Sequence, residues 1–339
     1  MLVCGPNCIR VANLVDSVAL SSVALSPKTR AGGVSAVVQS GAICLGLANS
    51  ARFGFRYLIS SGNEAVLSAA DYNGYLVNDP HTKVIVAFLE GISSPEKFVT
   101  AARAAVEAGK PILAVKIGRS EMARRTVQAH TGSLAGSDAV CDAVFLRLGV
   151  MRLNTLDELI EAAAFFVTCP LPEGVGVGLL SLSGGQIGLI ADLAQDLGLE
   201  FPVLSEQAQR ALSEILQPYI SIANPMDAWG SGDLEKTYPA CVDVVAQEKS
   251  VHLLAISRDT PPDIADREVE QSLSVAESAV RSARKTGKPV LMFSNLSAGF
   301  HPAQTVDCYE RWLLDVRSNL DIKDKIWYPH RYEKRGQSW

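Results

Sequence analysis

A histidine near the middle of the chain stands in a segment built otherwise mainly of small residues. The segment reads RTVQAHTGSLAGSDAV over residues 125–140, and His130 is one of five histidines among 339 residues. Taken alone, it could simply belong to the start of a helix. Imidazole also titrates near neutral pH, so the ring could serve as a nucleophile, a general base or a metal ligand. Neighbouring residues must decide between these roles.

A glutamate supplies a partner for such a ring. The run VIVAFLEGI (84–92) predicts a buried strand that ends at Glu90-Gly91, and a carboxylate there is costly to desolvate unless it has a partner. A carboxylate bonded to one imidazole nitrogen fixes the tautomer and raises the basicity of the other nitrogen. With Glu90 beside it, the ring of His130 could therefore attack phosphorus and carry a phosphoryl group.

No metal centre is expected. A metal site at His130 would need further histidines or cysteines nearby, and the sequence places none there. Cys4 and Cys8 are the closest pair among seven cysteines, but no second ligand pair follows at zinc spacing. The odd, scattered set of cysteines indicates reduced thiols in the cytoplasm.

The two halves of the chain follow one plan. GVSAVVQSGAICLGLANSARFGF begins at residue 33 and GVGLLSLSGGQIGLIADLAQDLGLEF at residue 176, each an apolar run, a Ser-Gly pair and a periodic stretch of helix length. Further on, AARAAVEAGKPILAVK (101–116) matches AVRSARKTGKPVLMFS (279–294), each a predicted helix, a Gly-Lys-Pro stop and a buried strand. Continuous apolar strands that alternate with amphipathic helices predict two tandem doubly wound α/β domains with mostly parallel sheets.

The domain boundaries follow from this repeat. We place the first domain at 25–167 and the second at 174–315, with the Pro- and Gly-containing TCPLPEGV as the linker and 316–339 as a tail or linker. In such sheets a ligand sits beyond the carboxyl ends of the strands. The two Ser-Gly turns lie there, and each opens a helix whose free N–H groups can bind an anion. We expect the two turns to face a common cleft.

Composition excludes several classes of protein. The net charge of −5 leaves no basic field to attract nucleic acid. No apolar run reaches the roughly 18 residues that a membrane span needs, and the first residues, MLVCGPNCIR, lack the plan of a signal peptide. We expect a cytoplasmic protein that binds neither nucleic acid nor a membrane.

Five motifs in register resemble those of one enzyme family. They are AHTGSLAGSD (129–138), VQSG (38–41), SSGN (60–63), FLEGI (88–92) and NPMD (224–227). Their order and spacing over roughly residues 5–315 are similar to the NDP-forming acyl-CoA synthetases, relatives of succinyl-CoA synthetase that include the ADP-forming acetyl-CoA synthetases. The resemblance implies two flavodoxin-like ligase domains. It also implies the reaction carboxylic acid + CoA + ATP ⇌ acyl-CoA + ADP + phosphate, which runs through an acyl phosphate and a phosphohistidine on a mobile loop.

The resemblance assigns roles to particular residues of this chain. His130 matches the histidine that is phosphorylated, and Glu90 matches the glutamate that holds it. Three further sets match binding positions: Gln39, Ser40 and Gly41 at a first phosphate-binding helix start; Asp227, Gly230 and Gly232 at a second; and Ser61, Gly62 and Asn63 at a turn that faces the acyl group.

The sequence also departs from the family pattern. The family begins with a CoA-binding domain that ends near a GPNCIG motif, whereas GPNCIR begins here at residue 5, so we read 1–24 as the end of that domain and a connector. Arg10 replaces a glycine and Val38 replaces the first serine of SQSG. A nucleotide-binding ATP-grasp domain is not recognisable either. We therefore expect a subunit or fragment that binds no cofactor alone and forms no acyl-CoA alone.

The complete enzyme implied by the family needs partners. An ATP-grasp domain or subunit and a CoA-binding domain or subunit would bring ATP or ADP, phosphate, Mg²⁺ and CoA to a small carboxylic acid, in an oligomeric assembly. Two alternatives remain. One is a non-catalytic scaffold or regulatory module derived from the family. The other is a flavin or dinucleotide binder, which lacks the expected glycine-rich fingerprint.

Overall fold

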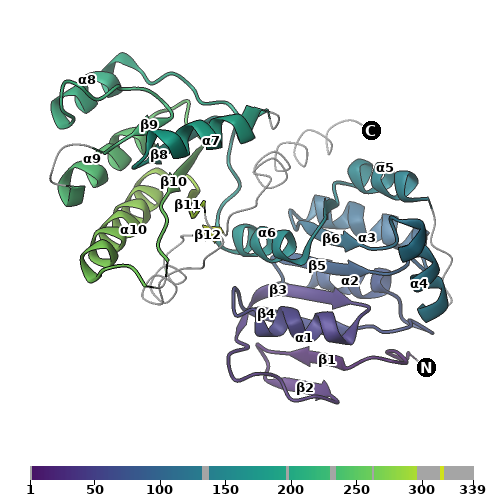
Figure 1. Cartoon of the computed structure of the whole chain (residues 1–339). Coiled ribbons are helices and arrows are strands. Elements are labelled where there is room, and N and C mark those ends of the chain that lie inside the picture. Colours follow the sequence, from purple (N-terminus) through teal and green to yellow (C-terminus); the bar gives the residue numbers. More distant parts are fainter. Residues whose placement is uncertain are drawn as a thin grey trace. The chain divides into compact units, whose positions relative to one another are not determined.

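The computed structural model describes residues 2–131, 137–195, 198–229, 234–261 and 263–295, and the strand Leu314–Val316; for 129–131 it describes the helical backbone only. The described chain divides between Val167 and Thr168 into two compact units (Figure 1). Each unit is described by itself, as the first domain and the second domain.

The first domain is built on a parallel sheet. Its strands are β3 (Ala31–Val38), β4 (Phe55–Ser60), β5 (Val84–Leu89), β6 (Ile112–Lys116) and β7 (Met151–Leu153). They lie in the order β4-β3-β5-β6-β7, and each neighbouring pair is parallel. Counted along the chain this is the flavodoxin-type order 2-1-3-4-5, with its topological switch between β3 and β5. The predicted doubly wound parallel sheet is confirmed.

Helices cover both faces of this sheet. They are α1 (Gly41–Asn49), α2 (Ala69–Asn78), α3 (Pro95–Glu107), α4 (Glu121–Thr131), α5 (Asp138–Leu148) and α6 (Leu156–Thr168). The apolar sides of α2, α3 and α5 form one buried cluster with β3, β5 and β6. On the other face, Arg52 just after α1 pairs with the buried Glu161 of α6 at 2.6 Å. The strands β3, β5 and β6 are therefore buried on both sides, which explains their unbroken apolar sequences.

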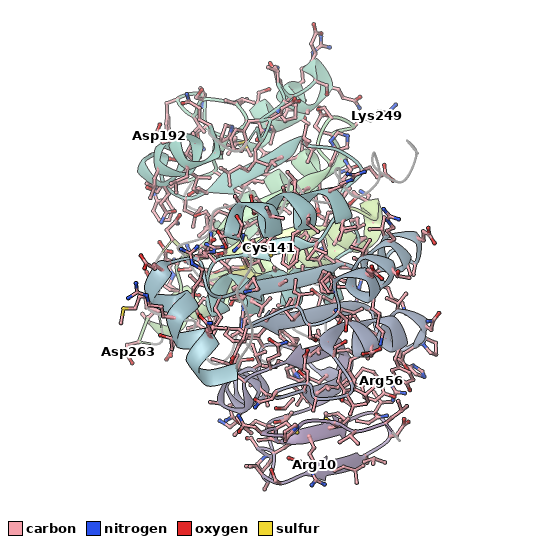
Figure 2. The ribbon with its side chains drawn as sticks, turned by 90° about the vertical axis from the view of Figure 1, so that its right-hand side faces the viewer. Arg10, Arg56, Cys141, Asp192, Lys249 and Asp263 are labelled. Carbon is pink, nitrogen blue, oxygen red and sulfur yellow. The ribbon has the colours of Figure 1, made fainter. Side chains whose placement is uncertain are left out.

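A hairpin extends the edge of the first sheet. Strands β1 (Arg10–Asn13) and β2 (Val18–Ser21) pair antiparallel with each other, and β1 pairs antiparallel with β4. Arg56 of β4, labelled in Figure 2, is buried and donates to the side chains of Asn13 and Asp16 at 2.8 Å and of Asp79 at 3.2 Å. Part of the segment that the sequence assigns to a connector thus belongs to the sheet of the first domain.

The second domain repeats the same topology. Its strands are β8 (Val177–Ser181), β9 (Met226–Asp227), β10 (Leu253–Ser257), β11 (Val290–Phe293) and β12 (Leu314–Val316), in the order β12-β11-β10-β8-β9 with parallel pairs throughout. The helices are α7 (Gly184–Gln195), α8 (Glu206–Ile215), α9 (Leu234–Gln247) and α10 (Asp266–Thr286). The order is again 2-1-3-4-5, so the sequence repeat reflects a repeat of the fold.

The Gly-Lys-Pro stops lie where the sequence predicts them. Gly109 and Gly287 follow α3 and α10 with φ of +65° and +72°, values that favour glycine. The buried strands β6 and β11 begin just after the two prolines. In the described part of the chain, no helix is both long enough and apolar enough to cross a bilayer.

Candidate functional site

The turns after β4, β3 and β5 meet at one edge of the first sheet. These strands are neighbours in the order β4-β3-β5 and all run in the same direction. The turns carry Ser61 to Asn63, Gln39 to Gly41, and Glu90. All of the first domain's sequence-predicted site residues except His130 therefore lie on the carboxyl edge, around the topological switch where such sheets bind ligands.

Ser40 and Gly41 begin helix α1. Ser40 has an extended backbone (φ −98°, ψ 122°), and its side chain accepts a hydrogen bond from the N–H of Ile43 at 3.4 Å. The first turn of α1 carries no acidic residue. The positive end of the helix dipole is thus not neutralised by an acidic residue of its own first turn, which is the arrangement that suits an anion.

The turn at Glu90 is held by Gln39. The Gln39 side-chain oxygen accepts from the N–H groups of Glu90 at 2.5 Å and Gly91 at 3.0 Å, and its amide nitrogen donates to the Gly91 carbonyl at 2.9 Å. Glu90 is only 7% exposed. The Gln39 side chain thus joins the turn after β3 to the turn after β5.

Lys116, the last residue of β6, reaches the same turn from the opposite side. Its Nζ donates to the carbonyl oxygens of Glu90 at 2.8 Å and Ile117 at 2.5 Å. Burial lowers the pKa of Lys116, while the nearby acidic groups, Glu90 and Asp138 among them, oppose that shift.

The segment that carries His130 is anchored at its end. His130 falls in the last turn of α4, and its side chain and residues 132–136 lie outside the described residues. Beyond them, the buried Arg152 of β7 bonds to the carboxylate of Asp138 and donates to the Asp138 carbonyl at 3.4 Å. The described residues thus fix where the segment resumes, at the start of α5 beside β7.

The turn from Ser61 to Asn63 is seated on the amino-terminal segment. The N–H of Asn63 donates to the Pro6 carbonyl at 3.0 Å, and its side-chain oxygen accepts from Asn7 at 3.2 Å. Gly62 has φ +61°, and a Cβ there would lie 2.2 Å from the Pro6 oxygen and 2.6 Å from the Asn7 oxygen. Both its backbone conformation and this close approach require glycine.

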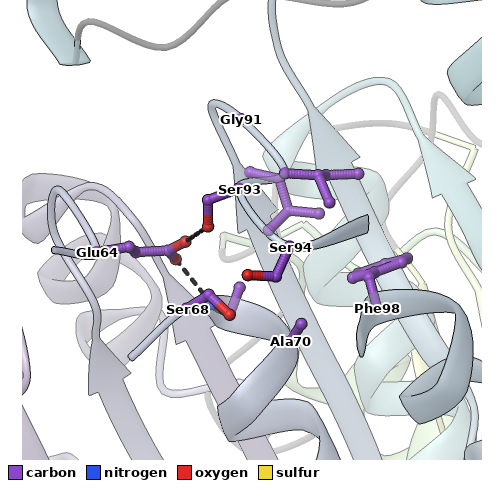
Figure 3. Close-up of a pocket in the computed structure, with 10 residues that line it drawn as sticks. Glu64, Ser68, Ala70, Gly91, Ser93, Ser94 and Phe98 are labelled. Carbon is purple, nitrogen blue, oxygen red and sulfur yellow. Dashed lines mark hydrogen bonds between the residues drawn. The ribbon is translucent and has the colours of Figure 1, made fainter. Parts of the chain in front are cut away.

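Glu64 is a site residue that the sequence reasoning missed. Its carboxylate accepts from the Ser61 hydroxyl at 2.8 Å, the Ala69 N–H at 2.9 Å and the Ser93 hydroxyl at 3.1 Å. It lies at the rim of a small pocket between the turns after β4 and β5, lined also by Leu89, Ile92 and Phe98 among others (Figure 3). Burial raises the pKa of Glu64, and hydrogen bonds from neighbouring side chains partly offset this.

Lys116 was not singled out either, although a signal existed. Lys116 follows the continuous apolar run ILAV (112–115), as Glu90 follows the run VIVAFL (84–89). The reasoning that a charge at a strand end needs a partner applies equally to both residues. Glu64 gave no such signal, because a charged residue in a polar turn is ordinary until the fold buries it.

In the second domain Asp227 lies at the end of β9 and accepts from the Trp229 N–H at 3.0 Å. A Cβ at Gly184, the first residue of α7, would lie 3.6 Å from its other carboxylate oxygen, so Asp227 faces that helix start. Gly230 and Gly232 lie outside the described residues.

The remaining strand ends of the second domain carry a closed polar network. The Asp259 carboxylate accepts from Gln186 at 2.7 Å, from the Ser294 hydroxyl at 2.7 Å and from the Asn295 N–H at 2.6 Å. Gln186 in turn accepts from the Ser181 hydroxyl at 2.8 Å. Polar groups from the end of β8, from α7 and from beyond β10 and β11 thus bind one another.

Comparison with known proteins identifies the family. The model of the succinyl-CoA ligase like flavodoxin domain matches residues 31–166. The alpha subunit of acetate–CoA ligase [ADP-forming] II from Pyrococcus furiosus is 33% identical over 296 residues, which are 86% of this chain and 63% of that subunit. The chain belongs to the NDP-forming acyl-CoA synthetases related to succinyl-CoA synthetase. The resemblance found in the five motifs is confirmed.

A further relative and a solved structure with the same fold show how much of each protein this chain covers. The 4-hydroxybutyrate–CoA ligase [ADP-forming] of Nitrosopumilus maritimus is 30% identical over 295 residues, 86% of this chain and 41% of that ligase. An acetyl-coenzyme A synthetase 1 of Ca. Korarchaeum cryptofilum, solved with phosphate and ADP, shares the fold with a TM-score of 0.81 at 24% identity, over 99% of this chain and 71% of that one. The chain spans less than two thirds of the length of the Pyrococcus and Nitrosopumilus proteins.

Replacing Gly62 by alanine should destabilise the first domain. A left-handed backbone costs a non-glycine residue roughly 1–2 kcal/mol, and the new methyl group would meet two main-chain oxygens. We expect urea unfolding of the full chain to show that the free energy of unfolding falls by about 2 kcal/mol or more. Gly74→Ala is the control: this glycine lies inside α2 with nothing within 4 Å of a Cβ, so alanine should stabilise by about 1 kcal/mol. Equal stabilities for Gly62→Ala and the wild type would contradict this account of the turn.

Glu64 should make folding stability depend on pH. Because its pKa in the fold lies above the ordinary value of 4.5, its stabilising contribution is fully present below 4.5 and is lost as the pH rises through the folded pKa. A Glu64→Gln side chain cannot ionise, and it can still accept from Ser61 and donate to Ser93. The free energy of unfolding of the variant relative to the wild type should therefore increase as the pH rises above 4.5. A difference that does not change with pH would show that the fold does not raise the pKa of Glu64.

Proposed function

We propose that the chain is the phosphohistidine-carrying part of an ADP-forming acyl-CoA synthetase, with the reaction carboxylic acid + CoA + ATP ⇌ acyl-CoA + ADP + phosphate. Family membership supports this, and one structural observation carries it further. Glu90 is a buried carboxylate on the carboxyl edge, joined through Gln39 to the turn that opens α1. A carboxylate and an anion-binding helix start are thus held in adjacent turns, as phosphoryl transfer to a histidine requires.

In the proposed step His130 attacks the phosphorus of an acyl phosphate. A nitrogen–phosphorus bond forms while the bond from phosphorus to the acyl oxygen breaks, and the carboxylate leaves with that electron pair. The attacking nitrogen carries no proton, and the other nitrogen keeps its proton in a hydrogen bond to Glu90. The carboxylate thereby stabilises the positive charge that develops on the ring.

The remaining site residues take binding roles in this proposal. N–H groups at Ser40 and Gly41 bind the phosphoryl group that His130 carries. We assign Asp227, Gly230 and Gly232 of the second domain to a second phosphate-binding segment, as the family resemblance implies. The turn from Ser61 to Asn63 faces the acyl group of a small carboxylic acid.

The nucleotide and CoA belong to partners in this proposal. An ATP-grasp domain or subunit supplies ADP or ATP and a CoA-binding domain or subunit supplies CoA, in an oligomeric enzyme. We place Mg²⁺ with the nucleotide, because this ion commonly binds the phosphates of a nucleotide substrate. The relatives from Pyrococcus furiosus and Nitrosopumilus maritimus are ADP-forming CoA ligases, which supports a need for a nucleotide and CoA.

The proposal is tested by phosphorylation of the full chain. Incubation with ³²P-labelled acetyl phosphate should place label on His130, detected at high pH because phosphohistidine is acid-labile. His130→Ala should abolish the label. Glu90→Gln should slow labelling about ten- to hundredfold, because an amide cannot balance the developing charge.

The control is His81→Ala, since His81 lies in the turn between α2 and β5. This variant should be labelled like the wild type. Label that survives in His130→Ala would overturn the phosphocarrier function and leave the scaffold function in its place.

A further inference from the structure

The backbone of Glu90 is held from both sides at the point where regular pairing of β5 ends. On the β3 side the last backbone bond joins the Gln39 N–H to the Phe88 carbonyl at 3.1 Å, and on the β6 side the Ile117 N–H donates to the Leu89 carbonyl at 3.0 Å. Beyond these bonds, side chains rather than neighbouring strands bind the main chain of the turn that follows β5. Gln39 binds the Glu90 N–H, and Lys116 binds the Glu90 carbonyl.

We propose that Lys116 is a positioning residue that, with Gln39, clamps Glu90 so that its carboxylate points where a phosphorylated histidine needs it. This inference rests on the proposed function, in which Glu90 orients His130. In this inference Lys116 acts in the reaction by positioning Glu90. Gln39 also positions Glu90 and is no longer assigned to bind phosphate.

The bonding pattern makes Lys116 suited to this role. An ammonium group has three donors and can bind several carbonyls at once. Two of these donors join the Glu90 carbonyl to the Ile117 carbonyl, so the turns after β5 and β6 are tied together. The direction of the Glu90 side chain depends on its backbone, and misplacement by about 1 Å is enough to cost a catalytic site much of its rate.

The charge of Lys116 supports the same role. The Glu90 carboxylate raises the pKa of Lys116, so the two groups attract each other. Burial works against the ammonium and lowers the pKa of Lys116.

The chain offers a matched control at the other end of β6. Lys110 lies just before this strand, and its Nζ donates to the main-chain carbonyls of Val77 at 2.7 Å and Asp79 at 2.6 Å. It therefore makes the same kind of contact at the amino edge of the same sheet. Lys110→Met removes a comparable structural anchor without touching Glu90.

Amide hydrogen exchange measures the clamp directly. In Lys116→Met and in Gln39→Leu, the amides of Glu90 and Gly91 should exchange about tenfold faster or more than in the wild type. In Lys110→Met any change should be confined to the residues around Val77 and Asp79. Unchanged exchange at Glu90 and Gly91 in both clamp variants would overturn the clamp, whatever the activity.

The rate of phosphorylation by acetyl phosphate tests whether the clamp contributes to the reaction. Lys116→Met should lower the first-order rate of His130 labelling about ten- to hundredfold, with the half-saturating concentration of acetyl phosphate changed less than about twofold. Lys116→Arg, which keeps the charge and the donors, should recover most of this rate. Lys110→Met should label at the wild-type rate.

The outcomes separate the two hypotheses. Absence of label on His130 in the wild type overturns the proposed function. A labelled wild type with an equally labelled Lys116→Met overturns the role of Lys116 alone. Equal losses of rate in Lys116→Met and Lys110→Met would also overturn it, because they would show a general effect on the fold.

Discussion

Main-chain polar groups at the end of β5 cannot be left without hydrogen bonds, because the strand is central and both of its faces are covered. The N–H and carbonyl groups of Glu90 and Gly91 are four such groups. Gln39 binds three of them and Lys116 binds the fourth. The arrangement of the site follows from this requirement, because satisfying these groups ties the turn that opens α1 to the turn that holds the buried carboxylate.

The sequence predicted the central strands β3, β5 and β6 of the first sheet and β8 and β11 of the second, because these strands are buried on two faces. Such strands read as unbroken apolar runs, and their ends mark where polar residues gather. Glu90 was found in this way, as were the two Ser-Gly turns. The fold class could be predicted on this basis, and the family from the five motifs in register.

The sequence could not show which polar groups pair. Gln39 and Glu90 are 51 residues apart, and Lys116 lies 26 residues beyond Glu90; only the strand order β3-β5-β6 makes them neighbours. The hairpin of β1 and β2 was missed for a related reason. Its strands are short and half exposed, so they lack the continuous apolar runs that indicate the buried strands. Whether His130 meets Glu90 stays a prediction.

The two domains share a topology but differ in the polar groups at the carboxyl edges of their sheets. At the carboxyl edge, Glu90 in the first domain corresponds in place to a closed network around Asp259 in the second. At the amino edge the copies agree. Lys110 binds the carbonyls at the end of α2, and Lys288 binds those of Ala246 and Glu248 at the end of α9. These lysines follow the glycines of the repeated Gly-Lys-Pro stops.

Duplication of one gene segment would explain this agreement. If one gene segment was duplicated to give both halves, the Gly-Lys-Pro lysine dates from before the duplication and has since been retained twice. Its bonds to helix carbonyls hold a helix to its sheet in either copy, so selection for folding alone is enough to preserve it. The opposite edge was free to diverge, and one copy kept a carboxylate in a turn beside an anion-binding helix start while the other turned its polar groups inward. Under that origin, the two ends of the same strands have diverged to different extents.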